Sequence, residues 1–391
     1  MPHNGTARRG LRYRREGTAL RLPEFKLERY FARYEFNVEH VLCASDCESL
    51  TLGELLDLEP GARERLERLW LGYTEAPGSP ELRQEIARLY TNIGPDDVLV
   101  HSGAQEAIFT FMHAALEPGD HVIVHSPCYQ SLRDVAAALG CRVSLWPARE
   151  EAGWALDLDD LRRLLEPDTR VVVVNTPHNP TGWLMPREDF LELNRITAER
   201  GIALFSDEVY RGLEENPAQR LPAACDLNPR AVSLGVMSKS YGLPGLRIGW
   251  VATRDRRLLE RMAAVKDYTT ICSSAPSEFL AALALRRGET LLARNRAILA
   301  ESRALADRFF ARHGHRFRWV RPSAGPIGFP RLVHGDAGDV EQFCRRLVQE
   351  AGVLLLPGSV YDVATPHFRL GLGRRDFPLA MERLEEFIAR M

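Results

Sequence analysis

The chain has 391 residues, of which 45% are hydrophobic and 27% are charged. This length and composition are typical of a globular protein with two or three domains. The formal net charge of -2 at neutral pH excludes a general attraction to nucleic acid or to an anionic membrane surface. No apolar run reaches the roughly 18 residues that a membrane span requires. We therefore expect neither a nucleic acid nor a membrane as a partner.

The first 22 residues form a basic segment, with five arginines between positions 8 and 15. We predict that residues 1–22 are a solvated, disordered tail, and an arm that binds acidic partners is the alternative. No apolar run follows the arginines, as a secretory signal would require, so we expect a cytoplasmic protein. The seven cysteines are scattered, and Cys43 and Cys47 have no matching Cys/His pair nearby. This pattern favours reduced thiols and indicates no metal site.

From about residue 100 to 255, short apolar runs alternate with longer segments of helical periodicity. The run Val171–Val174 consists of four valines, which is typical of a parallel strand buried on both faces. The alternation predicts an α/β fold, in which a mostly parallel sheet is flanked by helices on both faces. The expected strands are 98–100, 121–124, 171–174, 202–205, 231–234 and 248–252. One expected helix begins at Ala104, and two others cover residues 132–139 and 187–200.

The sequence beyond about residue 288 has a different pattern. A long charged helix, two short strand-like segments and a last helix are expected at 293–312, 316–320, 352–356 and 378–390. We predict that this part forms a smaller α+β domain together with the N-terminal segment. The predicted boundaries are 23–50 for the N-terminal segment of the small domain, 51–287 for the large domain and 288–391 for the C-terminal small domain.

Polar groups follow several expected strands, at the edge where α/β sheets bind ligands. Ser102–Gln105 opens a helix, where backbone N–H groups attract anions. Helix capping by Ser102 without a ligand is the alternative there. Asn179 lies in Asn175–Gly182 (NTPHNPTG), where Pro180 restricts its backbone to extended angles. This segment is either a plain turn or one that aims the Asn179 amide at a ligand.

Asp207 and Lys239 each follow an expected buried strand. Asp207 either starts a helix or faces a ring nitrogen and keeps it protonated. Lys239 lies between Ser238 and Ser240, before a Gly/Pro-rich turn that ends at Arg247. Partial burial near a cation such as Arg247 would lower the pKa of Lys239, so that its neutral amine could form an imine with an aldehyde. A solvated surface lysine is the alternative.

Two arginines are candidates for binding anions. Arg247 could pair with a phosphate dianion through two hydrogen bonds, because its guanidinium group is planar and carries several donors. Arg369 interrupts the alternating apolar run Phe368–Leu372 near the C-terminus. It either lies on an exposed strand edge or holds the carboxylate of a substrate.

Six motifs occur in one order over about 270 residues: SGAQEA, SPCYQS, NTPHNPTG, SDEVY, SKSYGLPGLRIGW and FRLGLG. Each motif alone is weak. The series closely resembles the class I/II aminotransferases, which are fold type I enzymes that use pyridoxal 5'-phosphate (PLP). The resemblance implies the aspartate-aminotransferase fold and a homodimer with shared active sites. It also implies transfer of an amino group between an L-amino acid and a 2-oxo acid.

The resemblance implies a role for each candidate residue. Lys239 would carry the cofactor as a Schiff base and shuttle the proton at the substrate Cα, and Asp207 would pair with the pyridine nitrogen. The catalytic residues so implied are Lys239, Asp207 and Tyr210. The implied cofactor-binding residues are Gly103, Ala104, Gln105, Tyr129, Asn179, Asp207, Tyr210, Ser238, Lys239, Arg247 and, reaching the neighbouring subunit, Tyr73. The substrate would be bound by Arg369 and Asn179.

The chain departs from the family pattern at two places. Val236 replaces a serine or threonine that usually binds the phosphate, a loss of about 1 kcal/mol unless backbone groups or Ser240 compensate. Residues 44–51 (ASDCESLT) replace a glycine-rich segment that closes over the substrate in many family members. Asp46 or Glu48 in this segment suggests a substrate with a basic or polar side chain, unless both carboxylates are only solvated.

Three further segments, SLTLGEL, KDY and GFPR, look similar to the capreomycidine synthases, PLP enzymes of the same fold that cyclise a hydroxylated arginine by elimination and addition. An elimination or cyclisation enzyme for an arginine-like amino acid is therefore the alternative to an aminotransferase. The third hypothesis is a regulator built on a catalytically silent PLP-binding domain. It would need a DNA-binding module, but only about 70 residues precede Tyr73, and most of them belong to the expected enzyme fold.

Overall fold

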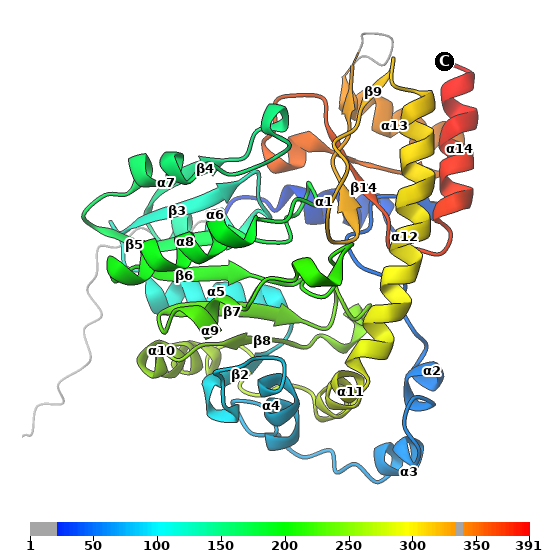
Figure 1. The fold of residues 1–391 in the computed structure, drawn as a ribbon. Helices are drawn as coiled ribbons and strands as arrows, with labels where there is room; N and C mark the ends of the chain where they lie inside the picture. Colours follow the sequence, from blue (N-terminus) through cyan, green and yellow to red (C-terminus); the bar gives the residue numbers. More distant parts are fainter. Residues whose placement is uncertain (1–21, 334–338) are drawn as a thin grey trace, which may run out of the picture.

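The computed structural model describes residues 22–333 and 339–391 (Figure 1). Except for residue 22, the predicted basic tail (1–22) lies outside the described residues. Within these ranges, no helix has both the length and the apolar surface to cross a membrane. The described cysteines, including Cys43 and Cys47, are free thiols.

A large sheet forms the centre of the structure (Figure 1). Its strands are β2 (Val98–His101), β3 (His121–Ser126), β4 (Arg142–Pro147), β5 (Thr169–Asn175), β6 (Ala203–Asp207), β7 (Ala231–Val236) and β8 (Gly249–Ala252). In the described part of the chain they are ordered β2-β8-β7-β6-β5-β3-β4. Strands β3 to β7 are parallel, whereas β8 runs antiparallel to β7 and β2. This arrangement confirms the predicted α/β fold with a mostly parallel sheet.

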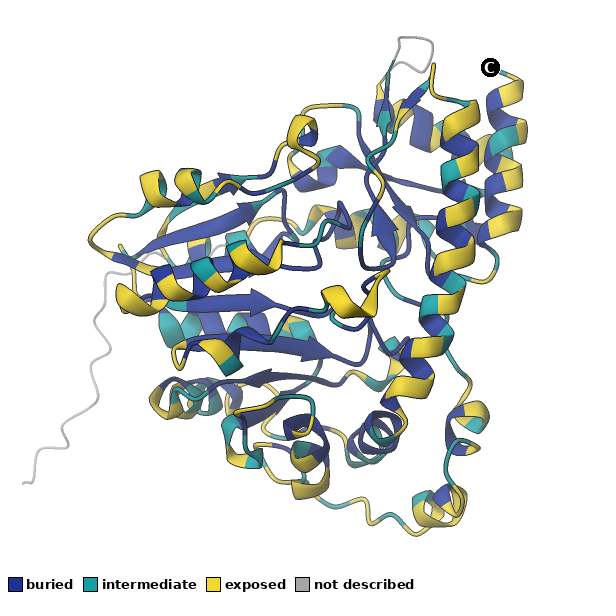
Figure 2. Cartoon of the chain, in the orientation of Figure 1, coloured by how far each residue is buried: buried dark blue, intermediate teal, exposed yellow. Residues whose placement is uncertain are grey.

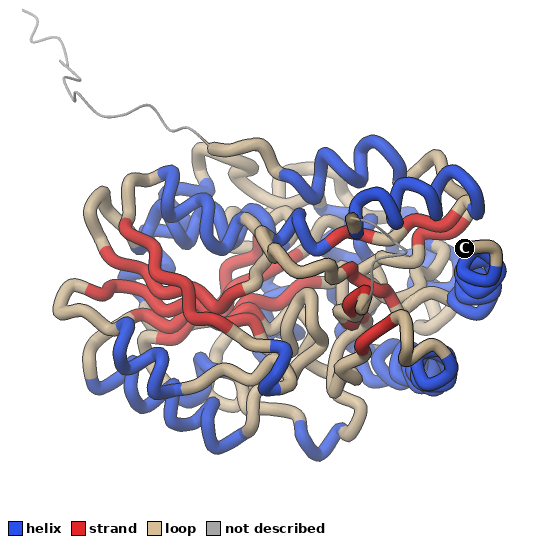
Figure 3. The backbone as a smooth tube through the Cα atoms, turned by 90° about the horizontal axis from the view of Figure 1, so that it is seen from above, coloured by secondary structure: helices blue, strands red, loops and turns tan. Residues whose placement is uncertain are grey.

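The four valines of β5 explain why helices cover both faces of the sheet. The first and third valines belong to the apolar cluster that contains helix α5 (Ala104–Ala115), and the second and fourth belong to the cluster that contains α8 (Arg187–Glu199). Because successive side chains of a strand point to opposite faces, a strand that is apolar throughout requires a helix layer on each side. Figure 3 shows the two layers, and Figure 2 shows the buried strands between them.

Most of the expected elements in this part occur within one or two residues of their predicted bounds. Strand β4 is the exception, because it lies at the edge of the sheet with partly exposed side chains and lacks a continuous apolar run. The remaining helices up to residue 286 are α1 (Lys26–Tyr34), α2 (Leu52–Leu56), α3 (Ala62–Glu67), α4 (Pro80–Ala87), α6 (Ser131–Ala138), α7 (Leu158–Leu164), α9 (Ala224–Leu227), α10 (Arg256–Lys266) and α11 (Ala275–Arg286).

The two ends of the chain form the smaller α+β part beside the large sheet (Figure 1). Its helices are α12 (Gly288–Arg312), α13 (Val340–Ala351) and α14 (Phe377–Ala389). Its strands are β1 (His40–Val41), β9 (Phe317–Arg318), β10 (Ile327–Gly328), β11 (Arg331–Leu332), β12 (Val353–Leu354), β13 (Leu356–Pro357) and β14 (Phe368–Gly371). The N-terminal segment joins this part because β1 pairs in parallel with β12. The domain boundaries at residues 50 and 287 stay a prediction.

Helix α12 starts at Gly288 and not at residue 293, and only Arg287 separates it from α11. The carboxyl ends of β5, β6 and β7 lie next to one another at one edge of the large sheet. Asn175 and Asp207 are paired in register there. Lys239 follows β7 at the same edge, so the topology of the sheet brings these polar residues together.

Candidate active site

A cavity of about 420 Å³ opens at this edge of the large sheet. Its wall combines the ends of β5, β6 and β7 with the start of α5, with β14 and with the N-terminal segment. The predicted site residues that line it are Ala104, Gln105, Tyr129, Asn179, Asp207, Tyr210, Ser238, Lys239, Arg247 and Arg369. The fold therefore brings together residues from motifs that are far apart in the chain.

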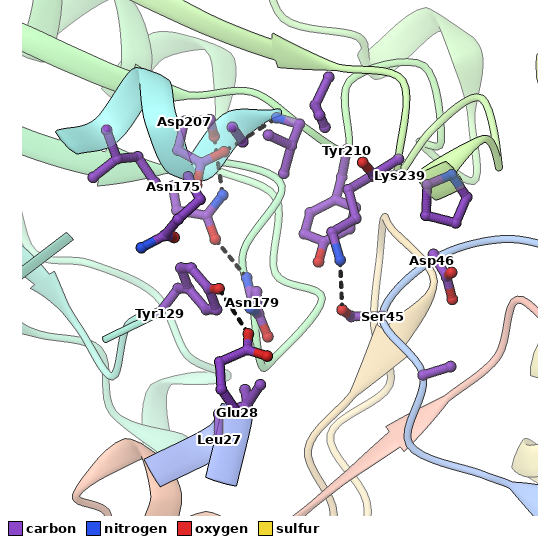
Figure 4. Close-up of a pocket in the computed structure, with 18 of the residues that line it drawn as sticks. Leu27, Glu28, Ser45, Asp46, Tyr129, Asn175, Asn179, Asp207, Tyr210 and Lys239 are labelled. Atoms are coloured by element: carbon purple, nitrogen blue, oxygen red, sulfur yellow. Dashed lines mark hydrogen bonds between the residues drawn. The ribbon is translucent and has the colours of Figure 1, made fainter. Parts of the chain in front are cut away.

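Lys239 reaches into the cavity from the loop after β7 (Figure 4). Its Nζ donates a hydrogen bond of 2.8 Å to Oγ of Ser45, a residue of the N-terminal segment. Burial lowers the pKa of Lys239 and the charge of Arg369 lowers it further, whereas Asp46 and Asp207 raise it. A lowered pKa increases the fraction of neutral, nucleophilic amine. The cation whose charge lowers this pKa is Arg369.

Asp207 ends β6, faces the cavity and is 5% exposed. Burial raises the pKa of its carboxyl group to about 7, against the opposing effects of the Val209 N–H and the charge of Lys239. Among the described residues, the Val209 N–H, at 3.2 Å, is the only hydrogen-bond donor to this carboxylate. A buried carboxylate with so little compensation fits a ligand that brings a cationic N–H, as a protonated pyridine does.

The first turn of α5 forms a corner of hydrogen-bond donors that could hold an anion, and it is called the anion corner below. Gly103 precedes this helix without a side-chain cap, so the backbone N–H groups of the first turn have no partners within the helix. A Cβ at Gly103 would overlap the Arg247 guanidinium group, and a Cβ at Gly249 would lie 2.7 Å from the carbonyl carbon of Gly103. Glycine at both positions therefore lets the guanidinium group approach the helix start. With the Ser238 hydroxyl 3.5 Å from Arg247, these donors fit a phosphate dianion.

Val236 lines the cavity next to this corner, where a hydroxyl was expected from the family pattern. The suggestion that Ser240 compensates is wrong, because its buried hydroxyl donates to the carbonyl oxygen of Val209 at 2.9 Å. The donors that remain for an anion are the first-turn N–H groups of α5, Ser238 and Arg247.

Arg369 lies on β14 and is 1% exposed, so it does not lie on an exposed strand edge. Its Nε donates to the Cys43 carbonyl oxygen at 2.9 Å, and its Nη1 donates to the Tyr361 hydroxyl at 2.5 Å. The Tyr361 hydroxyl donates to Asn179 Oδ1 at 3.0 Å, which leaves the Asn179 amide N–H groups for a ligand. Among the described residues, no carboxylate pairs with Arg369. A buried cation without a counter-ion fits the carboxylate of a substrate.

Two tyrosines complete the wall of the cavity (Figure 4). Burial raises the pKa of the Tyr210 phenol, and the positive charge of Arg369 acts in the opposite direction. The Tyr129 hydroxyl donates to Glu28 Oε1 at 3.1 Å. Tyr129 and Tyr210 line the same cavity as Lys239 and Asp207.

The cavity wall also carries three carboxylates from the N-terminal segment, namely Glu28, Glu35 and Asp46. Burial raises the pKa of Glu35, and Asp46 and Glu28 raise it further. Both oxygens of Asp46 accept hydrogen bonds of 2.9 Å from Arg374. In the described ranges, neither Glu28 nor Glu35 is paired with a basic side chain. Glu48 is not part of the wall, so Asp46 is the predicted acid that faces the cavity.

Tyr73 is one of two predicted residues that a single copy of the chain does not bring into the cavity wall. It is 87% exposed, and it lies in a surface groove beside Leu71 and Ser274. Gly103 is not in the cavity wall either, because it lies behind the guanidinium group of Arg247. Gly103 therefore contributes by lacking a side chain, which leaves room for the Arg247 guanidinium group.

Among the residues of the cavity and its supports that sequence reasoning did not assign to the site are Glu28, Glu35, Ser45 and Tyr361. One signal was available for the first two. Glu28 and Glu35 are seven residues apart around helix α1, a spacing that places them on the same helix face. No local pattern identifies Ser45 or Tyr361, since their partners come from other parts of the chain.

Asp207→Asn in the cofactor-free protein tests the burial of this carboxylate. The group keeps its proton up to about pH 7 in the folded protein but loses it near 3.8 when unfolded. Its contribution to stability is therefore lost as pH rises between these values. We expect the free energy of unfolding of the variant, relative to the unmodified protein, to rise by on the order of 3 kcal/mol from pH 4 to 7 and then to level off. Urea unfolding at several pH values measures this, and a pH-independent difference would contradict it.

A family model for aminotransferases of class I and II matches residues 41–378. The chain is 34% identical over 349 residues to the capreomycidine synthase of Streptomyces vinaceus, covering 88% of each chain. A PLP-dependent aminotransferase from Streptococcus suis superposes with a TM-score of 0.88 at 34% identity, covering 94% of this chain and 98% of that one. The PLP-dependent cyclase OrfR superposes with a TM-score of 0.85 at 29% identity, covering 97% and 99%. The protein therefore belongs to the class I and II aminotransferase family, with the aspartate-aminotransferase fold and pyridoxal 5'-phosphate as its cofactor.

Proposed function

We propose that the protein is a PLP-dependent aminotransferase that moves an amino group between an L-amino acid and a 2-oxo acid. One observation carries the proposal: the Lys239 amine, the Asp207 carboxylate and the Arg369 guanidinium group line one cavity. The reaction needs an amine that attaches the cofactor, an anion for the ring nitrogen and a cation for the substrate carboxylate. The three side chains supply these three groups.

The donors and acceptors around the cavity suggest how the cofactor is held. Its phosphate would be bound by the first turn of α5 with Ser238 and Arg247, and its ring nitrogen by Asp207. Tyr129 would stack on the ring, and Asn179 and Tyr210 would donate hydrogen bonds to its phenolic oxygen. Bound in this way, the cofactor supplies an electron sink for negative charge at the substrate Cα.

The protein's own residues would handle the proton and the substrate. Lys239 moves the proton at the substrate Cα, and its lowered pKa favours the neutral amine that can accept this proton. Arg369 binds the substrate carboxylate with two parallel donors, which fixes the position of Cα relative to the amine. Its hydrogen bonds to Cys43 and Tyr361 hold the guanidinium group before the substrate arrives.

Lys239→Ala tests the assignment of the lysine. We expect the variant to lose turnover by at least about 1,000-fold, together with the visible absorbance of the attached cofactor, because no other lysine lines the cavity within the described residues. Absorbance spectra with added PLP and an amino-group transfer assay measure both effects. Lys26→Ala, which removes a lysine outside the cavity wall, is the control. Retention of both properties in Lys239→Ala would mean that the lysine is misassigned.

A second candidate function is elimination or cyclisation on an arginine-like amino acid. The observation that favours it is the acidic part of the cavity wall, where Glu28 and Glu35 lie without basic partners among the described residues. A substrate held at its carboxylate by Arg369 could extend a cationic side chain to these carboxylates and to Asp46. The similarity to capreomycidine synthase and to the OrfR cyclase supports this candidate as well.

A single-substrate experiment separates the two candidate reactions. The holoenzyme is mixed with each standard L-amino acid, or with a hydroxylated arginine, in the absence of a 2-oxo acid. Transamination converts the cofactor to its amine form, so the visible absorbance is lost. Elimination or cyclisation releases ammonia or a cyclic product while the visible absorbance returns.

The acidic wall predicts selectivity for a cationic side chain. We expect the double substitution Glu28→Gln and Glu35→Gln to raise the half-saturating concentration of L-arginine about 10-fold and that of L-leucine less than 2-fold, because two carboxylates are lost at nearly constant volume. The visible absorbance of the cofactor reports the saturation. Glu48→Gln is the matched control, since its carboxylate is outside the wall. Equal effects on both amino acids would contradict a role in recognising charge.

We also propose that two copies of the chain form a dimer with shared sites. Leu71, Tyr73 and Tyr268 are 77%, 87% and 92% exposed, respectively. Their two segments lie side by side, because the Thr74 hydroxyl donates to the Ser273 carbonyl oxygen at 3.0 Å. Large exposed apolar side chains in neighbouring segments are typical of a protein interface. Tyr73 would then complete the active site of the second copy.

Mixing two variants tests the shared site. If Tyr73 acts in the neighbouring subunit, a dimer of one Lys239→Ala chain and one Tyr73→Ala chain contains one site with both native residues. We therefore expect activity to return when the two impaired variants are unfolded and refolded together, and not when each is refolded alone. Size-exclusion chromatography and the transfer assay measure this. If Tyr73 served its own chain, the mixed dimer would contain no native site and would stay inactive.

A further inference from the structure

Ser45 lies where two distant parts of the chain meet in the cavity. It belongs to the segment between β1 and α2, whereas Lys239 follows β7. Ser45 Oγ accepts the 2.8 Å hydrogen bond from Lys239 Nζ. Figure 4 shows the amine aimed at this hydroxyl, with the ring of Tyr210 beside it. The roles proposed above make no use of this contact.

The backbone on both sides of Ser45 packs closely against β14 and against Gly373, which lies two residues after the end of this strand. A Cβ at Gly371 would overlap the backbone of Ala44, and a Cβ at Gly373 would overlap the carbonyl oxygen of Asp46. The absence of side chains at both glycines therefore allows a close approach on each side of Ser45. The hydroxyl is presented to the amine by a supported backbone and not by a free surface loop.

The same segment also contacts the proposed substrate-binding arginine. Arg369 Nε donates to the carbonyl oxygen of Cys43, two residues before Ser45, at 2.9 Å. One short piece of chain thus touches both the group proposed to bind the substrate carboxylate and the amine proposed to act at the substrate Cα. Such a connection fixes the relative positions of two groups that come from different parts of the fold.

We propose that Ser45 orients the Lys239 amine for proton transfer at the substrate Cα, an inference that rests on the proposed function. The long side chain of Lys239 has many rotamers, and a buried amine N–H without a partner is unfavourable. By accepting one N–H, the Ser45 hydroxyl fixes the direction of the remaining N–H and of the lone pair.

Ser45→Ala in the holoenzyme tests this role. The probe is the L-amino acid that reacts fastest with the unmodified enzyme, used with hydrogen or deuterium at Cα. We expect normal visible absorbance of the cofactor and a half-saturating substrate concentration within about 2-fold, but a single-turnover rate about 10-fold lower. The deuterium isotope effect on that rate should increase, because proton transfer becomes more strongly rate-limiting. Ser45→Thr, which keeps the hydroxyl, should recover most of the rate.

Ser49→Ala is the matched control, since it removes a hydroxyl from the same segment outside the cavity wall and should leave all four quantities unchanged. An unchanged single-turnover rate in Ser45→Ala, or a lower rate with an unchanged isotope effect, would overturn the proposal. A change confined to substrate affinity would overturn it as well. A failure of the proposed function is distinguishable, because the unmodified enzyme would then show no visible absorbance with PLP or no reaction with any amino acid.

Discussion

The architecture of the cavity depends on a carboxylate that the surrounding protein leaves largely uncompensated. Asp207 ends a buried strand, and burial raises its pKa to about 7 because one backbone N–H is its only hydrogen-bond donor among the described residues. Such a group lowers the stability of the empty protein near neutral pH. A cofactor with a protonated ring nitrogen would supply the missing partner. The cofactor that the family uses and the buried carboxylate of this chain therefore fit each other.

A second constraint is that both ends of the chain contribute residues to the cavity at the edge of the sheet. The large sheet supplies the lysine, the aspartate and the anion corner, but Arg369 comes from the C-terminal part and Ser45 from the N-terminal segment. The N-terminal segment contributes Glu28 and Glu35 as well. The N-terminal segment is therefore the part of the chain that adds acidic side chains to the cavity, whereas the sheet supplies the proposed cofactor-binding residues.

Much of the fold and of the cofactor site could be predicted because the signals are local. The four valines of β5 indicated a strand with two buried faces, and Asp207 and Lys239 were identified because each follows such a strand. The edge strand β4 was missed, since partial exposure removes the continuous apolar run. Ser45 and Tyr361 were missed for another reason: their hydrogen bonds join residues 194 and 182 positions apart, and no periodicity reports such pairs.

The sequence by itself determined the fold class, the family and the chemical types at the site, because strand periodicity and ordered motifs are properties of short segments. Only the tertiary structure decided which of several similar side chains act. It brought Arg369 into the cavity of Lys239, where its charge lowers the pKa of the lysine, and it placed Asp46 but not Glu48 in the cavity wall. It also turned Ser240 away from the site and brought Ser45 into it. These choices depend on distances of a few ångströms between segments that only packing of the whole chain brings together.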